Sequence, residues 1–199
     1  MYTQDIQSAI VNYSVAHSGY DVHRSYIGLS GIGDCDQVIY DRTIAGKPAS
    51  VNEHLKTRLS YDLEAVLLER LRQVYGGRLK PGREIYLHDG LVQGHTDGFI
   101  AGDLLEIKTV EREEWLPVDR RLPNRVFYQV QAYLHYLDIR HAHVMYLARD
   151  TGAIYTIGVT YSPSIGRRID QKVERLVAAV RNLERPACSC GHCRMEGSE

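Results

Sequence analysis

The sequence lacks both a long apolar run and a large net charge. Its 24 basic and 25 acidic side chains nearly cancel, which gives a formal net charge of -1. A domain that binds nucleic acid through charge alone is usually strongly basic, so the composition does not point to such a domain. No stretch approaches the roughly 20 apolar residues that cross a membrane, and the first ten residues do not resemble a signal peptide. We therefore expect a cytoplasmic protein with no membrane partner.

Cysteine is scarce as well, with four among 199 residues. Disulfides are rare in the cytoplasm, so these thiols need another explanation. Cys35 lies near the start of the chain, whereas Cys188, Cys190 and Cys193 lie close together near its end. Four thiolates can hold a zinc ion or a 4Fe-4S cluster. Either group would join Cys35 to the C-terminal segment 188–193, and its binding energy would add to the stability of the fold.

The remaining composition, 44% hydrophobic and 25% charged, is that of an ordinary globular protein. This length predicts a single domain, residues 1–199, with a sizeable core. The apolar spacing predicts helices at 4–16, 51–75, 124–138 and 164–184, and strands at 83–88, 91–100, 103–110, 142–149 and 153–161. Residues 20–50 are rich in Gly, Asp and Ser and indicate loops with short elements. This order predicts an α/β fold with a central mixed β-sheet flanked by helices.

A short acidic motif lies on two of the predicted strands. Asp97 belongs to the segment 94–98, and Glu106, Ile107 and Lys108 follow on the next strand. Residues i and i+2 of a strand point to the same face. Glu106 and Lys108 therefore share one face, while Ile107 points the other way into the core.

The turn between these two strands decides how they pair. If residues 101–102 form the loop, Asp97 lies opposite Glu106; if residues 102–103 form it, Asp97 lies opposite Lys108. In either register the three side chains converge, with neighbouring Cβ atoms roughly 5 Å apart. Two carboxylates that close raise one of their pKa values unless a cation lies beside them.

Asp97 and Glu106 offer hard oxygen ligands that suit Mg²⁺ or Mn²⁺. The main-chain carbonyl of Ile107 could add a third oxygen. Lys108 is a compact cation that can orient an attacking water and offset developing negative charge. The alternative is a surface hairpin with an ordinary cross-strand ion pair, and the spacing alone leaves both interpretations open.

The predicted helix 124–138 carries Gln129 and Tyr133, which are four residues apart and lie on one helical face. Together they could position a phosphate or a water beside the metal. The alternative is an amphipathic helix whose tyrosines pack in the core.

Taken in order, Asp97, Glu106-x-Lys108 and Gln129-x-x-x-Tyr133 resemble the PD-(D/E)XK nuclease superfamily, and more closely its RecB-like branch. The resemblance implies a restriction-endonuclease-like core built on a central mixed sheet. It also implies DNA as the substrate and Mg²⁺ or Mn²⁺ as the cofactor, in a bacterial, archaeal or phage-infected cell.

Members of this superfamily usually place a further metal ligand on a helix before the strands. Glu64 is the favoured candidate, because residues 60–64 resemble the motif Gly-x-x-hydrophobic-Glu, with Ser60 in place of the glycine. His54 is the main competitor, and Glu69 is a weaker third choice.

The cysteine pattern resembles the iron–sulfur subset of the superfamily, which includes CRISPR adaptation nucleases and nucleases fused to helicases. The resemblance implies a 4Fe-4S cluster on Cys35, Cys188, Cys190 and Cys193 that joins the two ends of the chain. The spacing of the last three cysteines is tighter than the family usually shows. Zinc and free thiols therefore stay open as alternatives.

The resemblance implies a metal-dependent deoxyribonuclease, expected to be an exonuclease that acts on single strands or DNA ends. Phage recombination, DNA repair and CRISPR adaptation are the expected settings, with a helicase, a recombination protein or a CRISPR integration protein as partner. In this interpretation Glu64, Asp97, Glu106 and the Ile107 carbonyl hold the metal, while Lys108, Gln129 and Tyr133 act on water or phosphate.

Arg120, Arg121 and Arg125 bracket the start of the Gln-Tyr helix and are candidate contacts to the DNA backbone. The alternative is a solvated charged face. Two rival functions also stay open. One is a non-catalytic, cluster-stabilised nucleic-acid-binding or assembly protein, and the other is a redox-sensing iron–sulfur protein.

Overall fold

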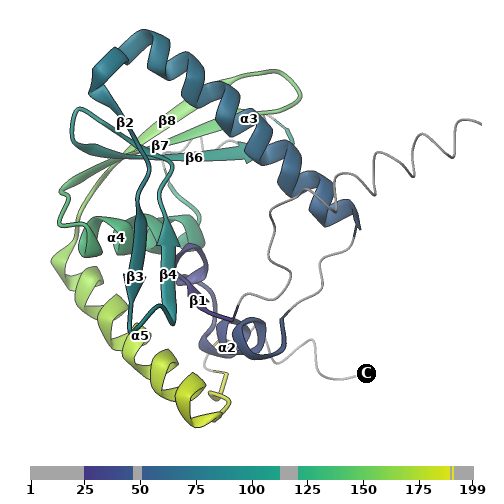
Figure 1. Cartoon of the computed structure of the whole chain (residues 1–199), viewed down its shortest axis with the longest axis vertical. Helices are drawn as coiled ribbons and strands as arrows, with labels where there is room; N and C mark the ends of the chain where they lie inside the picture. The colour runs from purple at the N-terminus through teal and green to yellow at the C-terminus, as the bar shows by residue number, and fades with distance from the viewer. Residues whose placement is uncertain (1–24, 47–50, 113–120, 189, 191–199) are drawn as a thin grey trace, which may run out of the picture.

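The computed structural model describes residues 25–46, 51–112, 121–188 and 190, with residues 51–54 described by their backbone alone. The predicted helix 4–16 lies outside the described residues. Within them the chain forms a mixed α/β fold in which helices flank two sheets (Figure 1). This confirms the predicted α/β class. The strands are divided between two sheets.

The larger sheet has five strands among the described residues, in the order β2-β5-β6-β7-β8. Their bounds are β2 Leu79–Pro81, β5 Gly98–Ile100, β6 Asp103–Val110, β7 His141–Ala148 and β8 Ile154–Thr160. β6 and β7 run parallel, and the other neighbouring pairs are antiparallel. β6, which carries Glu106, is therefore the central strand of a mixed sheet.

The smaller sheet pairs β1 (Ile27–Gly28), β4 (Val92–His95) and β3 (Glu84–Leu87), in that order. β1 runs parallel to β4, and β3 runs antiparallel to it. The prediction of one continuous strand over 91–100 is therefore wrong. That stretch divides into β4 and β5, which belong to different sheets.

Thr96 and Asp97 form the bend between β4 and β5. The Thr96 amide donates to the Arg83 carbonyl at 3.1 Å, and its hydroxyl accepts from the Arg83 amide at 2.8 Å. Gly82 packs so closely that a Cβ there would lie 1.7 Å from the Thr96 carbonyl oxygen. These contacts come from Gly82 and Arg83, in the segment between β2 and β3, so the apolar pattern of residues 91–100 could not reveal the bend.

α3 (Val51–Tyr75) lies across one face of the larger sheet (Figure 1). Its bounds match the predicted helix 51–75, and it ends at Gly76, whose φ of +54° is the left-handed conformation that stops many helices. Leu67, Leu68, Leu71 and Tyr75 of α3 pack against Leu79, Leu105, Ile107 and Met145 of the sheet. Ile107 therefore points into the core, as predicted.

α4 (Asn124–Tyr136) packs against the opposite face of the larger sheet, and α5 (Pro163–Asn182) packs along α4 (Figure 1). The predicted helices 124–138 and 164–184 agree with these bounds to within two residues. Buried side chains of α4 and α5, including Val130, Tyr133, Leu134, Ile169 and Leu176, form the main core with both sheets. None of the helices in the described ranges is long and apolar enough to cross a membrane.

The structure adds a helix that the sequence pattern does not predict, α2 (Asp36–Ala45), within the stretch expected to be loops. A short helical turn, η1 (Leu29–Gly31), precedes it. α2 buries few of its side chains, so its own periodicity is weak. It packs against α5, which lies near the other end of the described chain. This long-range contact stabilises α2, and a local sequence pattern cannot reveal such a contact.

Candidate active site

The β5–β6 hairpin settles the register between the acidic residues. Ile100 pairs with Asp103, so Ala101 and Gly102 form the two-residue loop. Their φ angles of 53° and 100° are both positive, as the tight turns of β-hairpins require. Gly98 pairs with Leu105, and Asp97 therefore faces Glu106 at the next position. The first of the two predicted registers is confirmed.

Glu106 is the most buried charged group of the site, with a relative exposure of 2%. Its Oε1 accepts from Lys108 Nζ at 2.5 Å and from Gln129 Nε2 at 2.6 Å. Its Oε2 is buried and has no hydrogen-bond partner among the residues that the structure describes. An unpaired buried carboxylate oxygen is costly, and a bound cation would remove that cost.

Asp97 lies beside the same strand. Its Oδ2 accepts from the main-chain amide of Ile107 at 2.5 Å, which ties the bend between β4 and β5 to the centre of the larger sheet. Ile107, whose carbonyl is a predicted metal ligand, is among the residues that line the same cavity. The hydrogen bond fixes one oxygen of Asp97, and the charge of this carboxyl group acts on Glu106.

The pKa values of the carboxyl groups in the site are all raised above their ordinary values. Burial raises the pKa of Glu106 to about 7, because Lys108 offsets the loss of solvent only in part and Asp97 adds a second negative charge. Burial and the charge of Glu64 raise the pKa of Asp97 to about 6. Burial alone would lower the pKa of Lys108, but the surrounding carboxylates, Glu106 first, raise it. Groups with this pattern are typical of an ion-binding or catalytic site.

α3 brings Glu64 to the same cavity. Burial and the charge of Glu106 raise the pKa of Glu64, so the two carboxylates are electrostatic neighbours. His54 lies ten residues earlier on α3, about 15 Å along the helix axis, and its side chain lies outside the described residues. Glu69 is exposed and pairs with Arg72 at 2.5 Å. Of the two candidates whose side chains are described, Glu64 lines the cavity and Glu69 does not.

Gln129 and Tyr133 lie on the face of α4 that meets β6. Gln129 Nε2 also donates to the Tyr133 hydroxyl at 3.2 Å, so one amide group links the tyrosine to Glu106. Both side chains are buried. Gly94 makes room for the ring, since a Cβ there would lie 2.9 Å from a Tyr133 ring carbon. In this structure Gln129 orients the carboxylate of Glu106.

The site opens into a cavity of about 210 Å³. Its lining includes the six predicted side chains Glu64, Asp97, Glu106, Lys108, Gln129 and Tyr133. They come from α3, the β4–β5 bend, β6 and α4, so the fold brings together residues spread over 70 positions. The donor set, three carboxylates and a main-chain carbonyl, fits a hard divalent cation.

Tyr146 is a neighbour of the site that the sequence pattern does not single out. It lies on β7 beside Lys108 in the parallel pairing, and its buried hydroxyl has no hydrogen-bond partner among the described residues. Burial and the charge of Glu106 raise its pKa to about 12. Alternation along β7 could have placed it on this face, but only once the β6–β7 register is known.

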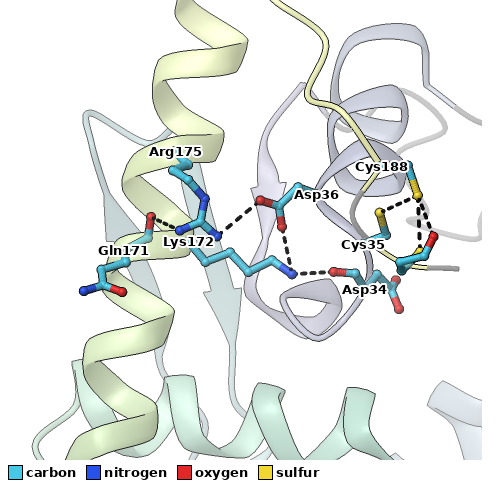
Figure 2. A network of polar contacts seen from close by, with 8 residues as sticks. Asp34, Cys35, Asp36, Gln171, Lys172, Arg175 and Cys188 are labelled. Carbon is cyan, nitrogen blue, oxygen red and sulfur yellow. Dashed lines mark hydrogen bonds and ion pairs between the residues drawn. The ribbon is translucent and has the colours of Figure 1, made fainter.

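Cys188 lies beside Cys35 at the start of α2 (Figure 2). Cys35 Sγ lies 3.7 Å from Cys188 Sγ, which lies 3.4 Å from Cys190 Sγ. The three thiols lie within 4.8 Å of one another. Sulfur atoms around a tetrahedral zinc ion are roughly 3.8 Å apart, as follows from Zn–S bonds of about 2.3 Å. The three thiols therefore fit a thiolate-bound metal, and Cys193 lies outside the described residues.

The structure describes two of the three arginines that are candidate DNA contacts. Arg120 lies outside the described residues. Arg121 and Arg125 are exposed near the start of α4, and Arg125 Nε lies 3.6 Å from Asp34 Oδ2. Arg125 is thus partly neutralised by a carboxylate of the segment before α2.

Comparisons of the sequence find no matching family model and no matching curated protein. Comparisons of the structure do find similar folds. SSO0001 aligns with a TM-score of 0.57 and 17% identity over 95% of this chain and 92% of that one. LHK-Exo, an alkaline exonuclease from Laribacter hongkongensis, aligns in its complex with dAMP with a TM-score of 0.62 and 11% identity, over 81% and 90%.

A phage-related exonuclease from Haemophilus somnus 129PT aligns with a TM-score of 0.50 and 13% identity, over 62% of this chain and 69% of that one. At these identities the similarity establishes a shared fold. The chain thus has the nuclease-like α/β fold of these exonucleases, and its function is argued from its own site.

Proposed function

We propose that the protein is a divalent-metal-dependent DNA nuclease, an exonuclease that acts on single strands or DNA ends. The observation that carries this proposal is the unpaired Oε2 of Glu106, buried among two other carboxylates and a lysine beside an open cavity. The shared fold with two exonucleases supports the same reaction class.

Each residue has a role in this proposal. Glu64, Asp97, Glu106 and the Ile107 carbonyl would hold Mg²⁺ or Mn²⁺. The ion, when bound, would polarise the phosphodiester and lower the pKa of an attacking water. Lys108 would orient that water and offset the charge that develops on the phosphate. Gln129 and Tyr133 would keep the Glu106 carboxylate in position, as their hydrogen bonds indicate.

Cleavage of end-labelled single- and double-stranded DNA tests the proposal. Wild type should cut in Mn²⁺ and not in EDTA, while Glu106→Gln and Lys108→Ala should lose at least 100-fold in rate. Glu69→Gln is the matched control, because it removes an exposed carboxylate of α3 that does not line the cavity. Full activity of the Lys108→Ala protein would refute the mechanism. Metal-independent DNA binding without cleavage would favour the non-catalytic alternative.

We further propose that the cysteine site holds a metal group that joins Cys35 to the C-terminal segment. The resemblance favours a 4Fe-4S cluster, whereas the sulfur spacing fits a single zinc ion. Iron and zinc analysis of protein purified without oxygen, together with its visible absorption, separates the two. Absence of both metals would leave the thiols free and refute this part of the proposal.

A partner protein completes the proposal. The near-neutral net charge gives the chain little general attraction for DNA. A helicase, a recombination protein or a CRISPR integration protein would supply that affinity. Phage recombination, DNA repair or CRISPR adaptation would then be the setting. Co-purification with a processive helicase or an integrase would identify which one.

A further inference from the structure

The cysteine site joins two parts of the chain that are 153 residues apart, and Cys35 is its sole described ligand from the N-terminal part. Cys35 is the residue before α2, with an extended backbone at φ −61° and ψ 142°. A single thiol at a helix start binds a metal more tightly if the main chain on both sides of it is already held in place. The structure provides such a hold from α5.

Lys172 of α5 contacts both neighbours of Cys35 (Figure 2). Its Nζ donates a short hydrogen bond to the main-chain carbonyl of Asp34, and lies 3.1 Å from Oδ1 of Asp36. The side chains of Lys172 and Asp36 are 18% and 19% exposed, so this ion pair is largely shielded from solvent. A shielded pair holds its geometry better than an exposed one, because water and salt screen it less.

The same carboxylate has a second partner on α5. Arg175 Nη2 lies 3.4 Å from Oδ2 of Asp36, so the two oxygens of Asp36 meet two cations of one helix (Figure 2). Asp36 also begins α2, where a negative charge is favoured by the helix dipole. The start of α2 is therefore fixed in both direction and distance relative to α5.

The opposite side of the site is held to α2 as well. Arg185 Nε and Nη2 donate to the two carboxylate oxygens of Asp41 at 2.7 and 2.6 Å. This bidentate pair brings the segment that leads to Cys188 alongside α2. The Arg185–Asp41 pair is largely exposed, and so contributes less than the Lys172 pair.

We propose that Lys172 is a positioning residue for the cysteine site: it holds the Asp34–Cys35–Asp36 segment so that the Cys35 thiol meets Cys188 and Cys190. This inference rests on the proposed metal site. The hydrogen bond and the ion pair of Lys172 reach the two neighbours of Cys35, so its effect on metal affinity acts through the position of Cys35. Residues that orient a metal ligand from outside typically change metal affinity 10–100-fold when they are removed.

Titration of the metal-stripped full-length protein with Co²⁺ under argon tests the inference, because cobalt–thiolate absorption reports the cysteine site alone. Lys172→Met should weaken Co²⁺ binding at least tenfold, and Lys172→Arg should restore most of the affinity because it keeps the donors. Arg168→Met, an exposed change four residues earlier on α5, should match wild type. A purely structural role would lower the melting temperature of the metal-free protein and leave the affinity of the folded fraction unchanged.

Affinity of Lys172→Met within twofold of wild type would overturn the inference and leave the metal site standing. Absence of cobalt–thiolate absorption in wild type would overturn both. If circular dichroism finds Lys172→Met unfolded, Asp36→Asn decides, since it removes the ion pair but keeps the hydrogen bond to Asp34. Asp36→Asn should then bind Co²⁺ at least threefold more weakly, and equal affinity would count against the inference.

Discussion

At the scale of single residues, the site is governed by the competition between burial and charge at Glu106. The carboxylate has two donors on one oxygen and none on the other. Burial destabilises the ionised carboxylate more than the nearby Lys108 ammonium group stabilises it. The pKa of Glu106 therefore rises. A cation between Glu106 and Asp97 would reverse that balance.

This competition predicts the pH dependence of stability without metal. The folded-state pKa values of Asp97 and Glu106, about 6 and about 7, lie above the ordinary values of 3.8 and 4.5. The folded state therefore binds more protons than the unfolded state, and this contribution to stability is complete below pH 4 and lost as pH rises through 7. Urea unfolding in EDTA should find roughly 2–4 kcal/mol less stability at pH 8 than at pH 5 from these groups.

Two comparisons isolate that effect from other titrating groups. Glu106→Gln should flatten the pH dependence, whereas Glu69→Gln should leave it unchanged. Adding Mn²⁺ to wild type at pH 8 should recover the lost stability. A wild-type protein that gains stability over Glu106→Gln between pH 5 and pH 8 would contradict the interpretation.

At the scale of elements, the sequence predicts the pieces with strong internal periodicity. α3 is predicted to the residue, and alternation along β6 correctly turns Ile107 to the core. The bend at Asp97 and the helix α2 are missed, because contacts with distant segments decide both. Glu64 could be nominated by motif, but its approach to the carboxylates depends on how α3 crosses the sheet.

One substitution in the turn of the β5–β6 hairpin should stabilise the protein. Ala101 has a positive φ of 53°. This backbone conformation is unfavourable for most residues, whereas Gly adopts it freely and Asn tolerates it well. Ala101→Asn should raise the free energy of unfolding by about 0.5–1 kcal/mol. Gly102→Ala should lower it by about 1 kcal/mol through backbone strain alone, since no atom lies near its added Cβ. Thermal melts of both variants check the pair, and equal melting temperatures would argue against this turn.

Gly82 should be intolerant of any side chain. A Cβ at Gly82 overlaps the Thr96 carbonyl, so Gly82→Ala must open the bend that carries Asp97. We expect a loss of about 1–3 kcal/mol of stability and weaker Mn²⁺ binding. Gly77→Ala is the matched control, because nothing lies within 4 Å of its added Cβ. Unchanged Mn²⁺ affinity in Gly82→Ala would separate the bend from the metal site.

At the scale of the whole molecule, the two ends of the fold meet at α2. The exposed Arg185–Asp41 pair is worth less than about 1 kcal/mol, so the thiolate-bound metal is expected to hold the C-terminal segment. Glu184 is an exposed residue, and removing that metal should speed cleavage after it by endoproteinase Glu-C, because the surrounding main chain opens more readily, and leave the sheets intact. Mass spectrometry of the digest, with Cys35→Ser as a metal-free reference, checks this. Equal cleavage rates with and without metal would show that the metal does not hold the segment.

The 153-residue separation of Cys35 and Cys188 also has a mechanical consequence. A metal that joins them closes the chain into a loop that contains the larger sheet, strands β3 and β4 of the smaller sheet, and the carboxylate site. Under tension applied to the two termini, force then bypasses that loop, and extension comes first from the segments outside it. Rupture of the metal–thiolate bonds would release the whole loop, about 500 Å of contour length, and pass the load to β6 and the carboxylates it carries.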